Sequence, residues 1–162
     1  MIRDATADDL GEIVAIYNAS IPGRLATADL TPVSVDSRRA WFAEHDPAHH
    51  PLWVYDDDDV VAGWLSLGSF YQRAAWDATA EVSVYVSPGH QKRGLAATLL
   101  SEAISRAPEF GLTSLVALIF GHNQPSLNLF HRFGFDDWGN MPEVCDVDGI
   151  KRDVMILGRH VA

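Results

Sequence analysis

The chain has one cysteine, no long apolar run and few basic residues among its 162 positions. With Cys145 alone, no internal disulfide can form, and a free thiol is compatible with a reducing cytoplasm. No apolar stretch approaches the ~20 residues that a membrane-spanning helix needs. The first residues show no signal-peptide core. These absences lead us to expect a cytoplasmic protein without a membrane partner.

Basic residues are scarce: 12 Lys and Arg stand against 22 Asp and Glu, a formal net charge of −10. This balance argues against a nucleic-acid partner, because phosphate backbones are bound by clustered Lys and Arg. The seven histidines lack metal-ligand spacing, so we predict no metal. The four aspartates at 56–59 are interpreted as a solvated hairpin loop, because a tight turn cannot aim successive side chains at one ion.

The stretch 81–100 carries the strongest signal in the chain. Residues 81–86 alternate polar and apolar types and predict a strand, and from Gln91 the apolar spacing becomes helical. Gly94 lies between the two, in a loop that also holds Lys92 and Arg93. A loop that opens a helix directs several N–H groups at one point, which favours a phosphate ligand. The alternative, that Gly94 only permits a tight turn, stays open at this stage.

The remaining pattern predicts one α/β domain over residues 1–162, because no linker or composition shift divides the chain. The apolar run 114–120 indicates a strand buried on both faces. Helices are expected after Thr6, from Ser34 or Asp36 to about Pro47, from 91 to about 107, and from 125 to Gly134. Strands are expected at 2–3, 52–55, 60–67, 81–86, 114–120, 135–138 and 152–157.

Gln91, Gly94 and Ala96 fill the Q/R-x-x-G-x-G/A signature, and the chain resembles the GNAT superfamily of N-acetyltransferases. Segments 85–88, 123–126 and 133–135 are similar to motifs of its phosphinothricin acetyltransferase-like branch. The resemblance implies the GNAT fold, a mixed and mostly antiparallel sheet whose central strands splay apart, flanked by helices. It also implies acetyl-CoA as co-substrate and, as in many branch members, a homodimer.

The resemblance assigns cofactor contacts to two stretches and one further residue. The backbones of Val84, Tyr85 and Val86 would pair with the pantetheine arm. Asn123 matches a position whose side chain contacts that arm, although Asn is also favoured as a plain helix N-cap. The pyrophosphate would be held after Gln91 by the N–H groups of Lys92, Arg93, Gly94, Leu95, Ala96 and Ala97.

Glu81 is our candidate general base. It stands in Thr79-Ala80-Glu81, where the branch has Thr-Val-Glu, and a partly buried carboxylate has the raised pKa that suits removal of a proton from an ammonium group. Pattern alone favours an exposed Glu on an alternating strand. No general acid is assigned, because Phe130 replaces a His found in many branch members and His131 is turned ~100° from that position.

The segment 71–77 is expected to form the substrate loop. Arg73 suits an acceptor carboxylate, because its guanidinium binds in a bidentate fork. Asp77 stands where branch members often have Arg, and it alternatively indicates a cationic amine. Trp76 is expected in the pocket, with core packing as the alternative.

The function we predict is direct transfer of an acetyl group from acetyl-CoA to the amine of a small amino-acid-like substrate. A protein or peptide N-acetyltransferase is the second enzymatic hypothesis. A non-catalytic acyl-CoA-binding sensor is the third hypothesis, favoured by the missing helix His and by Asp77.

Overall fold

The computed structural model describes residues 1–162 and shows the predicted alternation of strands and helices. No helix is both long and apolar enough to span a membrane. The elements are β1 (Ile2–Asp4), α1 (Leu10–Ser20), α2 (Arg39–Ala43), β2 (Leu52–Asp57), β3 (Val60–Ser69), β4 (Thr79–Val86), α3 (Leu95–Arg106), β5 (Ser114–Phe120), α4 (Gln124–Arg132), β6 (Asp136–Val147) and β7 (Ile150–His160).

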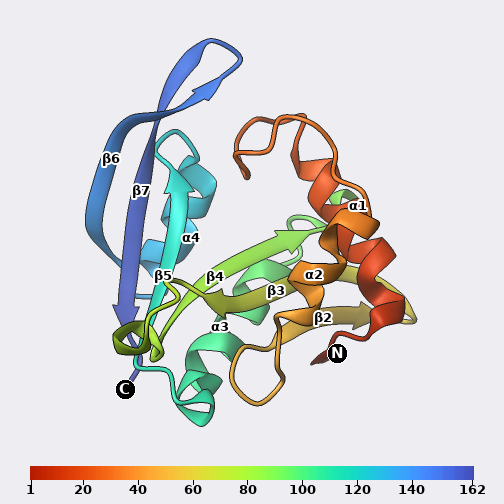
Figure 1. Ribbon diagram of the computed structural model, residues 1–162. Helices are drawn as coiled ribbons and strands as arrows, with labels where there is room; N and C mark the ends of the chain where they lie inside the picture. The colour runs from red at the N-terminus through yellow and green to blue at the C-terminus, as the bar shows by residue number, and fades with distance from the viewer.

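The seven strands form one sheet in the order β1-β2-β3-β4-β5-β7-β6. Every neighbouring pair is antiparallel except β4 and β5, which run parallel and pair only over Thr79–Glu81 with Ser114–Val116. Beyond this short ladder the two strands diverge, with α1 and α2 beside one half of the sheet and α4 beside the other (Figure 1). The predicted mixed, mostly antiparallel sheet with a splayed central pair is confirmed.

Two apolar clusters hold the helices to the sheet. The larger lies under α3 and includes Trp53, Leu99 and Leu115, and the smaller packs Ile13 of α1 against Trp64 of β3. The run 114–120 is a strand as predicted, but it is not buried throughout, because Leu118 is 43% exposed. Leu118 lies beyond the short ladder, where β4 has turned away, so the splay itself uncovers it.

The N-terminal segment is fixed by ion pairs that the pattern did not show. Asp9 accepts a hydrogen bond from the Thr6 N–H at 2.7 Å, which caps the start of the predicted helix. It also accepts hydrogen bonds from both Nη atoms of Arg3, at 2.8 and 2.9 Å. This bidentate partner lowers the pKa of Asp9. The Arg3 Nε donates to Asp56 at 2.9 Å. The aspartate run is therefore only partly a solvated turn.

Three of the predicted elements, α3, β6 and β7, have clearly different bounds. The helix expected from Gln91 begins at Leu95, because Gly94 takes a left-handed conformation (φ 77°). The last two strands form a longer hairpin than predicted, turning at Asp148 and Gly149, whose φ angles are both positive. Irregular pairing between β6 and β7 hides the alternation that would have marked those strands in the sequence.

Replacing Gly63 of β3 tests the close approach of β3 and β4. A Cβ at this position would lie 2.9 Å from the Tyr85 carbonyl oxygen, which is backbone and cannot move aside cheaply. We expect Gly63→Ala to lower the free energy of unfolding by about 1–3 kcal/mol. Gly11→Ala is the control, because Gly11 has open space in α1 and alanine there should stabilise the fold by about 0.5–1 kcal/mol. Urea denaturation midpoints of the two variants would measure both effects, and equal shifts would contradict the prediction.

Candidate active site

The loop before α3 forms a cradle for an anion. Lys92 and Gly94 both have positive φ angles (62° and 77°), and this alternation turns successive N–H groups toward one concave surface. A cavity of about 600 Å³ opens there. It is lined by Val86, His90, Gln91, Lys92, Gly94, Leu95, Ala96, Ala97, Pro125, Asn128, Leu129 and Arg132.

The cationic side chains that line the cradle are not the expected pair, Lys92 and Arg93. Lys92 lines the cavity, but the Arg93 side chain turns to Asp57 at 3.2 Å and is not part of the lining. The second cation comes instead from Arg132, at the end of α4. Sequence reasoning missed Arg132 because it lies far from the loop along the chain. A Lys, an Arg and the N-terminus of α3 together fit a diphosphate.

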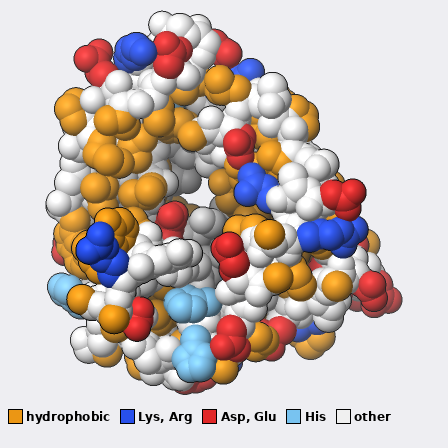
Figure 2. Space-filling view, viewed as in Figure 1, with side chains coloured by type: hydrophobic (Ala, Val, Ile, Leu, Met, Phe, Trp, Pro, Cys, Tyr) orange, Lys and Arg blue, Asp and Glu red, His pale blue; other side chains and the backbone are white.

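The gap between the diverging strands forms a slot of about 380 Å³. The edge of β4 from Val82 to Val86 has no strand partner on the β5 side, so its backbone is available to a ligand. Most of the lining residues are apolar, and the space-filling view shows a hollow in this region (Figure 2). Val84, Tyr85 and Asn123 line the slot, and Val86, the next residue of β4, lines the cradle, so the two spaces lie along the same strand edge.

The segment 22–32, which has no regular structure, supplies one wall of the slot. Its carbonyl oxygens accept three hydrogen bonds: Arg24 from His122 Nε2 at 3.0 Å, Leu25 from Asn123 Nδ2 at 3.1 Å, and Ala26 from the Tyr85 hydroxyl at 3.0 Å. Sequence reasoning gave this segment no role, because side-chain bonds to carbonyls leave no mark in the composition of the segment that accepts them.

Asn123 combines two structural roles. Its side-chain oxygen accepts the Ser126 N–H at 3.3 Å and caps α4, while its nitrogen holds Leu25. The expected helix cap is thus present, and the side chain is 7% exposed at the slot.

Glu81 lies at the point where the slot begins. It is the last β4 residue paired with β5, opposite Val116, and its carboxylate has no hydrogen-bond or ion-pair partner in the structure. Burial raises the pKa of Glu81 above its ordinary value. It lines the slot and also a second cavity on the α2 side of the sheet, so this residue borders two spaces.

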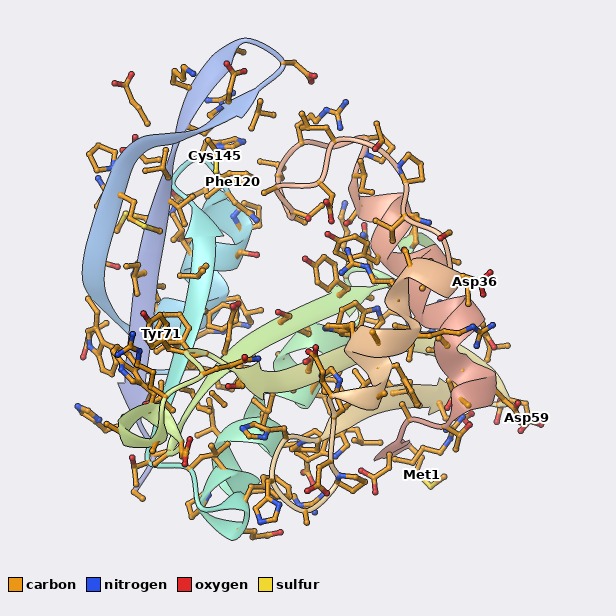
Figure 3. The ribbon with its side chains drawn as sticks, viewed as in Figure 1. Met1, Asp36, Asp59, Tyr71, Phe120 and Cys145 are labelled. Atoms are coloured by element: carbon orange, nitrogen blue, oxygen red, sulfur yellow. The ribbon has the colours of Figure 1, made fainter.

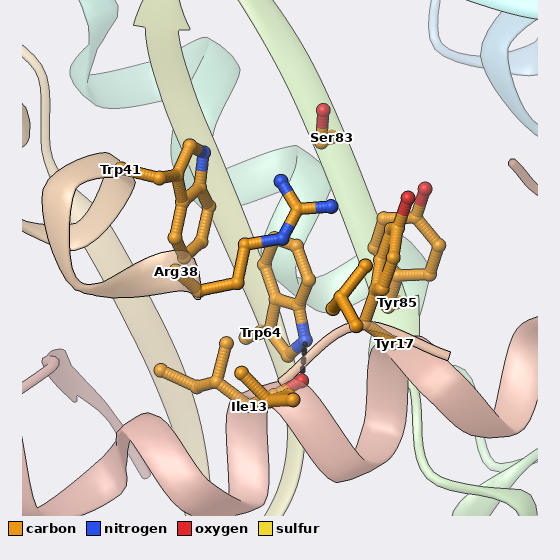
Figure 4. A pocket seen from close by; sticks show the side chains of 9 residues that line it. Ile13, Tyr17, Arg38, Trp41, Trp64, Ser83 and Tyr85 are labelled. Atoms are coloured by element: carbon orange, nitrogen blue, oxygen red, sulfur yellow. Dashed lines mark hydrogen bonds between the residues drawn. The ribbon is translucent and has the colours of Figure 1, made fainter. Parts of the chain in front are cut away.

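That second space, which we call the polar cavity, measures about 320 Å³. A neighbouring aromatic pocket of about 200 Å³ contains Tyr17, Trp41, Trp64 and Tyr85, with the Arg38 guanidinium directed toward Ser83 (Figure 4). Trp41 and Ser83 line both spaces. Tyr85 stacks on Trp64 with ring centroids 4.8 Å apart, and burial raises the pKa of its hydroxyl.

The three expected substrate-loop residues lie outside these cavities. Trp76 is 42% exposed and packs on Phe70 and Tyr71, and Arg73 stands over the Tyr71 ring at 5.8 Å. None of Arg73, Trp76 and Asp77 lines the cradle, the slot, the polar cavity or the aromatic pocket. Figure 3 shows Tyr71 at the opposite end of the slot region from Phe120 and Cys145.

The helix after Asn123 follows the predicted orientation. Phe130 is buried and lines the slot, whereas His131 turns away and contacts Asp137 at 2.7 Å. No group of three or more His, Cys, Asp or Glu side chains is arranged to hold a metal ion.

Comparison with known proteins identifies the family of the chain. The acetyltransferase (GNAT) family model matches residues 12–135. YwnH of Bacillus subtilis, provisionally named a phosphinothricin acetyltransferase, is 44% identical over 99% of both chains. The L-methionine sulfoximine/L-methionine sulfone acetyltransferase of Pseudomonas paraeruginosa is 38% identical over 88% of this chain and 84% of its own. A phosphinothricin acetyltransferase from Sinorhizobium meliloti, solved with acetyl-CoA, has a TM-score of 0.92 at 30% identity and covers 99% of this chain and 87% of its own.

The fold is that of an acyl-CoA-dependent transferase. Its features are the parallel strands β4 and β5 that diverge, the anion cradle and the slot. This chain belongs to the GNAT acetyltransferase family, in the phosphinothricin acetyltransferase-like branch. It is an acetyl-CoA-dependent N-acetyltransferase.

The cradle can be tested with two glycines that share one conformation. Gly94 (φ 77°) and Gly111 (φ 76°) both have open space where a Cβ would stand, but only Gly94 lines the cradle. Alanine at either position should cost about 1 kcal/mol of stability through the left-handed backbone. We expect only Gly94→Ala to raise the Kd for acetyl-CoA, by about tenfold. Calorimetric titration of both variants measures this, and equal affinities would show that the cradle does not bind the diphosphate.

Proposed function

We propose that this enzyme transfers acetyl directly from acetyl-CoA to the amine of a small amino-acid-like acceptor, with Glu81 as general base. The observation that carries the proposal is the position of Glu81 at the start of the splay. From there Glu81 borders both the slot and the polar cavity. An acceptor in the polar cavity and a thioester in the slot would therefore meet at this residue.

The chain offers a fitting place for each part of the donor. The cradle, with Lys92 and Arg132, would hold the diphosphate, and the free β4 edge at Val84–Val86 would pair with the pantetheine amides. Bound acetyl-CoA supplies the acetyl group as a reactive thioester. These contacts fix its position, which lowers the barrier by orienting the reacting atoms.

Glu81 would remove the proton that keeps the acceptor nitrogen from attacking. Its burial disfavours the charged carboxylate, and the resulting rise in pKa makes it a better base toward an ammonium group. The nitrogen lone pair then forms the new amide bond as the carbon–sulfur bond breaks. The sulfur leaves with the electron pair of that bond and takes up a proton.

Two observations favour an amino-acid-like acceptor. Relatives named for methionine sulfoximine and phosphinothricin acetylation cover most of the chain. In addition, Arg38 is the one Lys or Arg side chain that lines the three spaces bordering Glu81 or Ser83. We propose that Arg38, rather than Arg73, binds the acceptor carboxylate, because Arg73 lies outside these spaces. The Arg38 Nη2 already donates to Asp29 at 3.0 Å, so the acceptor would bind through the remaining N–H groups of the guanidinium.

Replacing Glu81 tests the base. We expect Glu81→Gln to lower kcat by about 10²–10³-fold while the KM for acetyl-CoA is unchanged. Because the folded-state pKa of Glu81 is raised, its ionisation disfavours folding above that pKa, so the variant should be at least as stable as wild type at pH 7. In wild type, kcat/KM should fall as pH falls through the raised pKa. Thiol release and urea denaturation measure the three effects.

The same thiol-release assay defines the acceptor. L-methionine sulfoximine, L-methionine sulfone, phosphinothricin, cationic amino acids, polyamines and short peptides would be compared. Direct transfer predicts that Cys145→Ser, which changes the one thiol in the slot, keeps its turnover. Preference for peptides would contradict the acceptor class, loss of turnover in Cys145→Ser would contradict direct transfer, and full turnover in Glu81→Gln would contradict the base.

We also propose that the enzyme is a cytoplasmic homodimer, as the single cysteine and the family resemblance suggest. Exposed apolar side chains on the last hairpin support a second copy: Trp138 is 43% exposed, and Val144 and Ile150 are each 54% exposed. Light scattering of the purified protein should give twice the 17.8 kDa chain mass, and a monomer would refute the dimer.

A further inference from the structure

The polar cavity beside Glu81 has negative charge in its walls and no positive side chain to balance it. Two carboxylates, those of Glu44 and Glu81, line it, and no Lys or Arg does. The full lining is Trp41, Glu44, His45, Ser66, Gly68, Ser69, Gln72, Glu81 and Ser83. A space with this balance of charge suits a cationic hydrogen-bond donor.

The strand register places the polar side chains of the cavity on one face of the sheet. Ser66 of β3 stands opposite Ser83 of β4, and Gly68 stands opposite Glu81. Residues two apart on a strand point to the same side, so Glu81 and Ser83 share this face. Gly68 has no side chain, and this leaves space next to the Glu81 carboxylate. A Cβ there would meet only the Ser66 Oγ, at 3.7 Å.

The protonation of His45 is fixed by its partners. Its Nδ1 lies 2.9 Å from the Trp41 carbonyl oxygen, which can only accept, so Nδ1 carries the hydrogen. Its Nε2 lies 2.7 Å from the Ser66 Oγ. Burial lowers the pKa of His45, which favours the neutral ring at neutral pH. The neutral ring therefore presents a bare Nε2 to Ser66.

This arrangement determines what Ser66 offers to the cavity. Its hydroxyl hydrogen is committed to His45 Nε2, so toward the cavity the oxygen can only accept. Ser66 is 4% exposed, and a buried hydroxyl with a fixed direction is a selective acceptor. The carboxylate of Glu81 is the other acceptor on this face.

We propose that the polar cavity is the binding site for the ammonium group of the acceptor, which donates to the Ser66 Oγ and to the Glu81 carboxylate. His45 is a positioning residue that sets the direction of the Ser66 hydroxyl. The proposal rests on the proposed function, and it adds to that function the residues that select a primary ammonium. With Arg38 in the adjoining pocket, the two charged ends of an amino acid have separate partners on one face.

Replacement of Ser66 tests ammonium binding under conditions in which no acetyl transfer can occur. L-methionine sulfoximine is titrated calorimetrically into protein saturated with free CoA, so that no transfer occurs. We expect Ser66→Ala to raise its Kd by about tenfold, because a hydrogen bond to a charged donor is lost. N-acetyl-L-methionine sulfoximine lacks the ammonium and should bind both proteins alike. Ser101→Ala, on the exposed face of α3, is the matched control.

The pH dependence of the Kd distinguishes a positioning role of His45 from a role in packing alone. Protonation of His45 would make Nε2 a donor and turn the Ser66 hydrogen toward the cavity. In wild type, the Kd should therefore rise as pH falls through the lowered pKa of His45. His45→Gln keeps an acceptor oxygen but does not titrate, so it should bind nearly as wild type at pH 8 and lose this acid dependence.

Further variants test whether other titratable groups near His45 cause the pH dependence of the Kd. Glu44 precedes it in sequence, the charge of His50 also acts on it, and Glu81 lines the same cavity. In Glu81→Gln the dependence assigned to His45 should remain. His49→Gln, at an exposed site, should bind as wild type at every pH.

The outcomes distinguish this site from the proposed function. Equal Kd values for wild type and Ser66→Ala, or no binding by wild type, would overturn the ammonium site. A variant His45→Gln that keeps the full acid dependence would overturn the positioning role. Turnover of amino-acid-like amines without any effect of Ser66 would leave the proposed function standing, whereas Ser66-dependent binding without turnover would contradict the function alone.

Discussion

The parting of β4 and β5 is the constraint on which the rest of the structure depends. These strands form the one parallel pair in the sheet, and they share only three residues before they separate. A strand edge without a partner costs free energy unless its N–H and C=O groups find other partners. The separation therefore creates the slot and makes the β4 backbone available to a ligand. It also places Glu81, the last paired residue, between the two faces of the sheet.

Much of this architecture could be predicted from local patterns. The Pro and Gly residues around 88–94 separate strand from helix, and the cradle residue Gly94 is conspicuous because only a bare backbone adopts its φ angle readily. Arg132, Arg38 and His45 could not be found in this way. Each of these residues lies far along the chain from strand or loop residues that line the same cavity. The local sequence pattern around a helix does not show which distant loop or strand the end of that helix will contact. The segment 71–77 contributes Gln72 to the polar cavity, whereas Arg73, Trp76 and Asp77 lie outside the cavities and the aromatic residues of the segment pack on one another.

Charge is distributed unevenly around the two substrates. The chain is strongly acidic overall, yet the cradle has Lys92 and Arg132, whereas the polar cavity on the other face has two carboxylates and no cation. This distribution would attract an anionic donor and, in the proposed site, a cationic amine to opposite sides of the sheet. Arg93 does not add to the cradle because Asp57, from the aspartate run, neutralises it. Whether a charged side chain is available to a ligand therefore depends on the ion pairs that it makes within the protein.

The segment 22–32 is held through its backbone carbonyl oxygens, by His122, Asn123 and Tyr85. Every amino acid supplies such an oxygen, so these three attachments do not depend on the side chains at 24–26. Thr27 and Asp29 are held differently, because their side chains bond to the Tyr17 hydroxyl and, for Asp29, to Arg38. Leu25, Ala26 and Ala28, whose side chains make no hydrogen bond, can therefore change in size or polarity while the wall keeps its place. In this fold, selection can reshape one side of the slot by point mutation without first rebuilding the scaffold that holds it.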